Sequence, residues 1–234
     1  MSKSGFIVCL LGVTFSASAY AAISSAESKR LTEASTVLTE LRSTPEKGIP
    51  ENIWNGADCV MVFPSVKKAA FIVGGEYGKG VASCKGAKGW SAPAFMTLEK
   101  GSFGAQIGGQ AADIVLLVMN KGGMDKLLSD KVSLGAGASI AAGPVGRDAQ
   151  AATDAKLSAE ILSYSRAKGV FAGIDLTGGV LGPDKDANKD VYGESVMPRQ
   201  ILADQSVSAP REAATFLAAL QKGATAPVAT SGHK

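Results

Sequence analysis

The stretch CVMVFPSVKKAAFIVGGEYGKGVASC, residues 59–84, decides the fold class. Its apolar and β-branched residues predict a short strand over 59–63 that Pro64 ends. Two further strands, over 69–75 and 81–84, are joined by the glycine-rich segment 76–80, which is typical of a hairpin turn. The stretch therefore indicates an antiparallel sheet.

More strand and helix signals on both sides extend this sheet. Strands are predicted over residues 93–98 and 103–110, paired around Lys100-Gly101, and over 114–119, 132–142, 161–166, 170–176 and 179–181. Helices are predicted over 25–42, 50–55, 123–129, 199–203 and 211–222. No linker divides these elements. We expect one α+β domain, residues 22–222, with a curved, mainly antiparallel sheet or barrel-like core flanked by N-terminal and C-terminal helices.

The two ends of the chain differ from this body. Lys3, an apolar run over 5–15 and the Ala19-Tyr-Ala21 motif predict a signal peptide over residues 1–21. No other apolar run is long enough to span a bilayer. The polar tail, residues 223–234, is predicted to be disordered. We expect an exported protein that is periplasmic, associated with the cell envelope or secreted.

Two cysteines remain after removal of the signal peptide. An even pair in an exported protein predicts a disulfide between Cys59 and Cys84. Closing this loop stabilises a fold by about 3 kcal/mol. The alternative is a pair of buried free thiols.

Composition excludes most catalytic chemistry. The chain has 234 residues, a net charge of +3 and one histidine, His233, near its C-terminus. A catalytic triad or a histidine-based metal site is therefore not expected, and the charge is too low for a typical nucleic-acid binder. No phosphate-binding loop, dinucleotide fingerprint or nucleophile elbow occurs. We expect neither catalysis nor a cofactor.

One acidic run resembles the start of a calcium loop. Its oxygen-bearing residues alternate along the chain at Asp184, Asp186, Asn188 and Asp190. The sixth and twelfth positions of an EF-hand loop would need Gly and Glu, and this chain has Lys189 and Ser195 there. A solvated turn is the favoured interpretation, and no metal site is expected beyond this weak alternative.

Basic residues are predicted at strand ends and turns. The six candidates are Lys67, Lys68, Lys79, Arg147, Arg166 and Lys168. If these turns converge on one face, they form a positive patch that binds anionic lipid headgroups. The alternative is a set of ordinary solvated turns. The helix over 25–42 mixes acidic and basic residues on its polar face, which favours docking on the protein body over lying on a membrane.

A series of motifs, in order, resembles the SYLF domain family, also called the actin-patch protein domain. The resemblance covers roughly residues 30–220. The motifs are VKKAAF (66–71), GGEYGKG (74–80), WSAPAF (90–95), GAQIGG (104–109), DIVLLVMN (113–120), AGPVGR (142–147), YSRAKGVFAG (164–173) and NKDVYG (188–193). The signal peptide and the lack of an accessory domain are similar to the exported bacterial branch.

The resemblance implies a non-enzymatic domain that binds membrane lipids. Eukaryotic members bind phosphoinositides and, in yeast, actin filaments, and they use an amphipathic N-terminal segment with basic residues. The matching positions are the helix over 25–42 and Lys67, Lys68, Arg147, Arg166 and Lys168. For an exported chain we expect an anionic phospholipid of the envelope as partner. The alternative is a structural or interaction module that binds envelope proteins without direct lipid contact.

Overall fold

The computed structural model describes residues 23–43, 48–70, 72–104, 110–145, 158–167 and 170–221. The predicted signal peptide and C-terminal tail lie outside the described residues. The helices are α1 (Ser25–Ser43), α2 (Glu51–Gly56), α3 (Lys121–Leu127), α5 (Lys185–Tyr192), α6 (Pro198–Leu202), the 3₁₀ helix η2 (Arg211–Ala213) and α7 (Ala214–Gln221). The strands are β1 (Cys59–Ala70), β2 (Ile72–Gly86), β3 (Gly89–Trp90), β4 (Ala94–Gly104), β5 (Gln110–Val118), β6 (Val132–Ser133), β7 (Ile140–Ala142), β8 (Ile161–Ala167), β9 (Val170–Gly173) and β10 (Gly179–Pro183).

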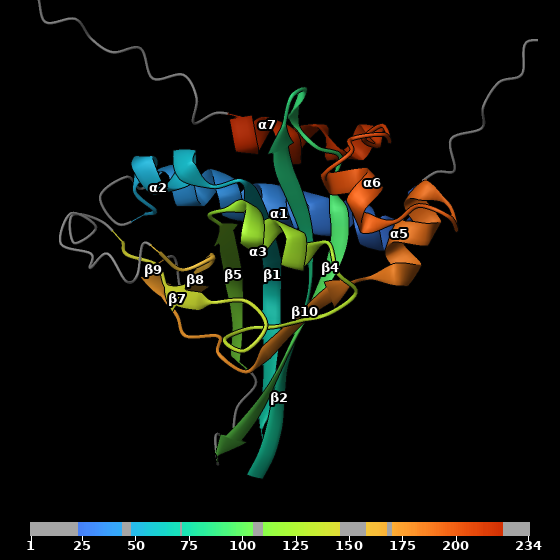
Figure 1. Ribbon diagram of the computed structural model, residues 1–234. Helices are drawn as coiled ribbons and strands as arrows, with labels where there is room; N and C mark the ends of the chain where they lie inside the picture. Colours follow the sequence, from blue (N-terminus) through green and yellow to red (C-terminus); the bar gives the residue numbers. More distant parts are fainter. Residues whose placement is uncertain are drawn as a thin grey trace, which may run out of the picture.

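The strands form one curled sheet, a half-barrel with helices at both ends of the chain, which confirms the predicted α+β class (Figure 1). The strand order is β6-β10-β4-β2-β1-β5-β8-β7, while β3 pairs with β2 and β9 pairs with β8. The pairs are antiparallel except β7 with β8. The segment 132–142, predicted as one strand, is divided between β6 and β7.

Both faces of the central sheet are buried, and alternate residues of each strand supply them. One face carries Val60, Val62 and Phe95 and packs with α1, α2 and α7. The opposite face carries Met61 and Phe63, and it packs with residues of α3 and α6. The concave side of the half-barrel is therefore occupied by its own side chains.

Pro64 does not end β1, contrary to the prediction. The strand continues to Ala70 because its pairing shifts on both sides of the proline. The pairing to β2 skips from Val62 to Lys67, and the pairing to β5 skips from Phe63 to Val66. Ser65, next to Pro64, has a φ of 50°. A bulge needs no ladder hydrogen bond from its extra residue, so a proline fits there.

The segment 76–80, predicted as a hairpin turn, lies in the middle of β2. Its glycines provide room for the bulge of β1 instead of turning the chain. A Cβ on Gly78 would lie 2.6 Å from Val66 Cγ2, and one on Gly80 would lie 2.3 Å from the Val62 carbonyl oxygen. The Lys100-Gly101 turn is also wrong, because both residues pair with β2 inside β4.

Replacing Gly80 by alanine should destabilise the protein by about 1–3 kcal/mol, because the new methyl group must displace backbone and the Phe63 ring. Gly101→Ala is the matched control, since its Cβ meets nothing within 4 Å. Urea unfolding of both variants measures the difference. Equal stabilities would contradict the tight contact at Gly80.

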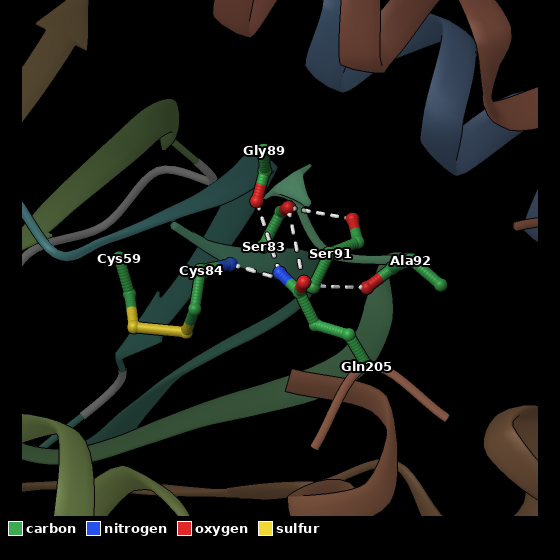
Figure 2. Close-up of a disulfide and its surroundings, with 7 residues drawn as sticks. All are labelled: Cys59, Ser83, Cys84, Gly89, Ser91, Ala92 and Gln205. Atoms are coloured by element: carbon green, nitrogen blue, oxygen red, sulfur yellow. Dashed lines mark hydrogen bonds between the residues drawn. A yellow bond between two sulfur atoms is a disulfide. The ribbon is translucent and has the colours of Figure 1, made fainter. Parts of the chain in front are cut away.

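The predicted disulfide between Cys59 and Cys84 is confirmed. The two cysteines are direct partners across β1 and β2, and both are buried (Figure 2). Beside them, the Ser83 hydroxyl donates to the Ser91 carbonyl at 2.8 Å, and the Cys84 amide donates to the Ser91 hydroxyl at 3.1 Å. The disulfide and these bonds together fix the end of β2 that leads into β3.

Candidate functional site

Strands β1, β2 and β4 continue past the helical layer and project from one end of the molecule, and the start of β5 pairs with β1 beside them (Figure 1). This sheet extension comprises residues 66–70 of β1, 72–78 of β2, 98–104 of β4 and 110–112 of β5. Pairing reaches Ala70 with Gly74 between β1 and β2, and Ile72 with Gly104 between β2 and β4. The extension is therefore an ordered ladder almost to its end.

The charged residues of the extension lie in two adjacent rows across three strands. We call them the charged rows. In the first row, Tyr77 of β2 lies opposite Lys67 of β1 and Glu99 of β4. In the second row, Glu76 lies opposite Lys68 and Lys100. The second row is one residue nearer to the projecting end.

The residues beyond the charged rows carry no charge. The sequence over 69–75 is AAFIVGG, and the sequence over 101–112 is GSFGAQIGGQAA. The chain passes from β1 to β2 through the first of these stretches, and from β4 to β5 through the second. A straight boundary thus separates charged from uncharged sequence across the extension.

The side chains of the charged rows differ in their contacts. Lys68 Nζ lies 3.2 Å from Glu76 Oε1, and Lys100 Nζ donates to the Asp175 carbonyl at 2.8 Å. Lys67 is exposed and forms no ion pair within the part of the chain that the structure describes. Its partner Tyr77 is 46% exposed, although it is a large aromatic residue. Lys67 and Tyr77 are thus available to a partner.

Lys79, the third candidate, belongs to a buried charge network. Its Nζ lies 3.0 Å from Asp184 Oδ2, and Arg30 Nη1 of α1 lies 3.0 Å from the same oxygen. Arg30 also lies 3.5 Å from Glu27 and stacks 5.3 Å from the centre of the Phe95 ring. The network joins α1, β2 and the start of α5, so the role of Lys79 in the structure is to hold these elements together.

Asp184 is ionised within this network. Burial raises the pKa of its carboxyl, but hydrogen bonds from Lys79 and Arg30 lower it, and the resulting pKa lies below the ordinary value. The side chains of Asp184 and Arg30 are only 7% and 8% exposed. Their pairing is therefore a structural contact with little access for a ligand.

Arg166 is also held by carboxylates. Its guanidinium pairs with Asp113 of β5 at 3.0 Å and with Glu40 of α1. Asp113 in turn accepts a hydrogen bond from the Ser65 amide in the bulge of β1, at 2.9 Å. These contacts join α1 to the sheet and leave the Arg166 side chain 19% exposed.

Of the four described basic candidates, Lys67 alone has no ion pair with a described residue, so they do not form a patch of free charges. Lys67 and Lys68 lie in the extension, on opposite faces of β1 because they are adjacent in a strand. Lys79 and Arg166 lie in separate ion-pair networks. All four are within strands, whereas the sequence predicted turns or strand ends. Arg147 and Lys168 lie outside the described residues.

The acidic run does not form a calcium loop. Residues 185–192 form α5, and Asp184 caps this helix by accepting from the Ala187 amide. Asn188 is buried and binds the backbone of Phe95 through both ends of its amide, at 2.8 Å each. Asp186 and Asp190 are exposed. Among the described residues, no group of three or more acidic, histidine or cysteine residues is arranged to hold a metal ion.

The N-terminal helix packs on the protein body, as its charge pattern predicted. Leu31, Leu38 and Leu41 of α1 are buried in the same hydrophobic cluster as residues of α7. The apolar face of α1 is therefore not exposed to a membrane. Within the described ranges, no helix is long and apolar enough to cross a bilayer.

The sequence reasoning missed Tyr77, Glu99 and Lys100 as members of the site. It placed Tyr77 and Lys100 in turns, and a residue in a turn has no paired residue on a neighbouring strand. A usable signal was the complete lack of charge over 69–75 and 101–112, with a lysine directly before each stretch and an acidic residue directly after it. Arg30 gave no signal, because it is one of several charged residues in a helix of mixed charge.

Several known proteins are similar to this chain. An SH3 domain-containing protein of Schizosaccharomyces pombe is 34% identical over 161 residues, which are 67% of this chain and 37% of that protein. LAS seventeen-binding protein 3 of Saccharomyces cerevisiae is 31% identical over 160 residues, 66% of this chain and 34% of that protein. The SH3 domain-containing YSC84-like protein 1 of Mus musculus is 29% identical over 180 residues, 75% of this chain and 53% of that protein.

The chain spans about a third to a half of the length of these relatives. Their names describe binding and SH3 domains, and none names a catalysed reaction. The model of the Ysc84 family, described as Las17-binding protein actin regulator, matches residues 99–223, more than half of the chain. The resemblance noted from the motifs is thereby confirmed: the chain belongs to the Ysc84, or SYLF domain, family.

Proposed function

We propose that the protein is a non-enzymatic lipid-binding protein of the bacterial cell envelope, which recognises anionic phospholipid headgroups through the sheet extension. The observation that carries this proposal is Lys67, an exposed cation without a carboxylate partner in the described chain, at the edge of a projecting uncharged surface. The proposed location rests on the signal peptide predicted over residues 1–21. N-terminal sequencing of the protein from a periplasmic extract tests it, and a mature chain beginning at Ala22 is expected.

The charge of the extension is consistent with a modest preference for anionic membranes. Its charged rows hold three lysines and two glutamates. A lysine close to an anionic membrane contributes about 1 kcal/mol to binding. Lys68 shares its charge with Glu76, so Lys67 should contribute most of the electrostatic attraction. Binding should therefore weaken with salt but should not depend on charge alone.

Replacing Lys67 by glutamine should weaken binding to anionic vesicles about fivefold, the effect of losing about 1 kcal/mol. The measurement is co-sedimentation with vesicles of phosphatidylglycerol and phosphatidylcholine, over a salt series. Lys121→Gln is the matched control, because Lys121 is an exposed lysine of α3 without an ion pair among the described residues. Equal recovery of the wild type with neutral and anionic vesicles at every salt concentration would exclude headgroup recognition.

A second candidate function is binding of proteins without direct lipid contact. The observation in its favour is that Lys68, Lys79 and Arg166 are held in ion pairs and have little free charge for headgroups. The family description also refers to a protein partner. A partner crosslinked in the envelope, combined with no recovery on vesicles of any composition, would favour this function.

A further inference from the structure

We propose that the sheet extension enters the membrane end-on and stops at the charged rows, so that Lys67, Tyr77 and Glu99 lie at the level of the headgroups. This inference rests on the proposed function, because it states which surface meets the lipid and how deep it goes. It differs from headgroup recognition alone, in which a protein remains above the bilayer surface. The proposed binding partner of the uncharged end of the extension is therefore a lipid bilayer.

The alignment of the charged rows is the first argument. The ladder places Lys67, Tyr77 and Glu99 on one line across three strands, with Lys68, Glu76 and Lys100 on the next line. From there to the last described pairs of the ladder, the residues of the three strands are uncharged. A charge in hydrocarbon is costly, so a straight charge boundary is what a membrane surface requires.

The residue types in the first row are the second argument. Tyrosine concentrates at membrane interfaces, where its ring contacts the apolar region and its hydroxyl stays hydrated. Lysine beside it reaches water or phosphate with its ammonium group while its stem stays apolar. Tyr77 is 46% exposed and lies directly opposite the exposed Lys67. The pair therefore has the composition of an interfacial belt.

The length of the ladder limits the depth. Ile72, which forms the last pair with β4, lies four positions before Glu76 along β2. At about 3.3 Å per residue this distance is about 13 Å. It is less than half of the ~30 Å hydrocarbon core, so the extension would enter one leaflet only.

Backbone hydrogen bonding also favours shallow entry. On the outer side of β4, pairing with β10 reaches Lys100 and no further strand of the described chain continues it. The edge of β4 beyond Lys100 therefore has backbone groups that need polar partners. Such groups are costly deep in hydrocarbon, but headgroups and interfacial water can satisfy them.

A side-on approach is disfavoured by the same residues. Laying either face of the extension on the membrane would bring Glu99 on one side, or Glu76 on the other, against the anionic surface. Only the end-on orientation keeps both glutamates at the boundary while the uncharged sequence meets the lipid.

The test places an environment-sensitive NBD probe on cysteines introduced at positions 99 and 101, one on each side of the proposed boundary. The two residues lie on the same face of β4, about 7 Å apart. Gly101 has open space for a side chain, and Glu99 is exposed. Thr36→Cys, on the exposed face of α1, is the control position. The native disulfide is kept by labelling without reductant, and vesicles contain equal parts of phosphatidylcholine and phosphatidylglycerol.

With vesicles, the probe at 101 should shift to the blue, and iodide should quench it at least about threefold less, because iodide does not enter hydrocarbon. The probes at 99 and 36 should remain as accessible to iodide as in solution. Co-sedimentation with an unprotected probe at 101 would overturn end-on insertion while leaving lipid binding intact. Protection at 99 as well would overturn the boundary at the charged rows. A lack of co-sedimentation would overturn both proposals.

Discussion

Replacing Asp184 by alanine should destabilise the protein by about 3–5 kcal/mol, the cost of leaving a buried charge without its partner. Asp184 accepts from Arg30 and Lys79, each at 3.0 Å. Lys79 is 46% exposed and can turn to water, but the Arg30 side chain is 8% exposed. Arg30 would keep only the more distant Glu27, at 3.5 Å. The variant also removes the cap of α5.

The measurement is equilibrium unfolding in urea at neutral pH. Asp190→Ala is the matched control, because Asp190 is an exposed aspartate of the same helix. Its effect should stay within about 0.5 kcal/mol, as for an ordinary surface substitution. If both variants lose the same stability, the contacts of Asp184 do not carry the energy assigned to them here.

The effect of Asp184→Ala should also depend on pH. The folded protein holds the pKa of this carboxyl below its ordinary value, which is about 3.9 in an unfolded chain. A carboxyl with a lowered pKa adds stability at pH values above the unfolded pKa and loses it as the pH falls toward the folded pKa. The difference between wild type and variant should therefore be constant near neutrality and shrink below about pH 4. A difference that grows in acid would contradict the ionised state of Asp184.

The sequence predicted the class of the fold because its strands are strongly patterned. Residues over 59–63, 81–84 and 114–118 are mostly apolar, many of them valine, and they lie in buried parts of β1, β2 and β5. The disulfide was also predictable, because the predicted export favours disulfides and the predicted loss of Cys9 with the signal peptide would leave one pairing for the other two cysteines. These features depend on local composition, which a single sequence displays.

The long strands were not predictable by the same rules. Pro64 and the glycines over 74–80 are ordinary signals for the end of a strand and for a turn. In the fold, one bulge in β1 accounts for both, because it accommodates the proline and needs glycine opposite Val66 and Phe63. A compensation between two strands of this kind cannot be seen in either strand alone.

The candidate site was predictable only in part, for a related reason. Lys67 and Lys68 were identified from their charge, but four other basic residues carried the same signal. Asp113 and Asp184 distinguish them, because these two carboxylates reach Arg166 and Lys79 from distant parts of the sequence. Such pairing depends on tertiary contact. The charged rows likewise exist only once the register of three strands is known.

The two halves of the sheet consequently have different roles. The half under α1 contains the buried ion pair of Asp184 with Arg30 and the partly buried network around Arg166, and we expect it to supply most of the stability. The extension holds the charged rows and the uncharged end, and substitutions there can change binding without unfolding the protein. Position 101 separates these effects best, since its backbone is in β4 and its side-chain space is open.

A carboxylate at position 101 should weaken vesicle binding at least about tenfold, because end-on insertion would carry the charge past the headgroups. Leucine at the same position should strengthen binding, by up to about tenfold, since it adds apolar area that the membrane can bury. Both variants should fold normally, because a Cβ at position 101 meets nothing within 4 Å.

This prediction distinguishes end-on insertion from other modes of binding, because aspartate and leucine at one position should change vesicle binding in opposite directions. Co-sedimentation of Gly101→Asp and Gly101→Leu with the same vesicles measures it, and thermal unfolding checks that both remain folded. Thr36→Asp is the control for added negative charge, because Thr36 lies on the exposed face of α1. A surface that binds by charge alone would lose affinity with either aspartate and gain nothing from leucine. A partner protein without membrane contact would leave vesicle recovery low for all three variants. End-on insertion alone requires that leucine and aspartate move binding in opposite directions at position 101 while position 36 has little effect.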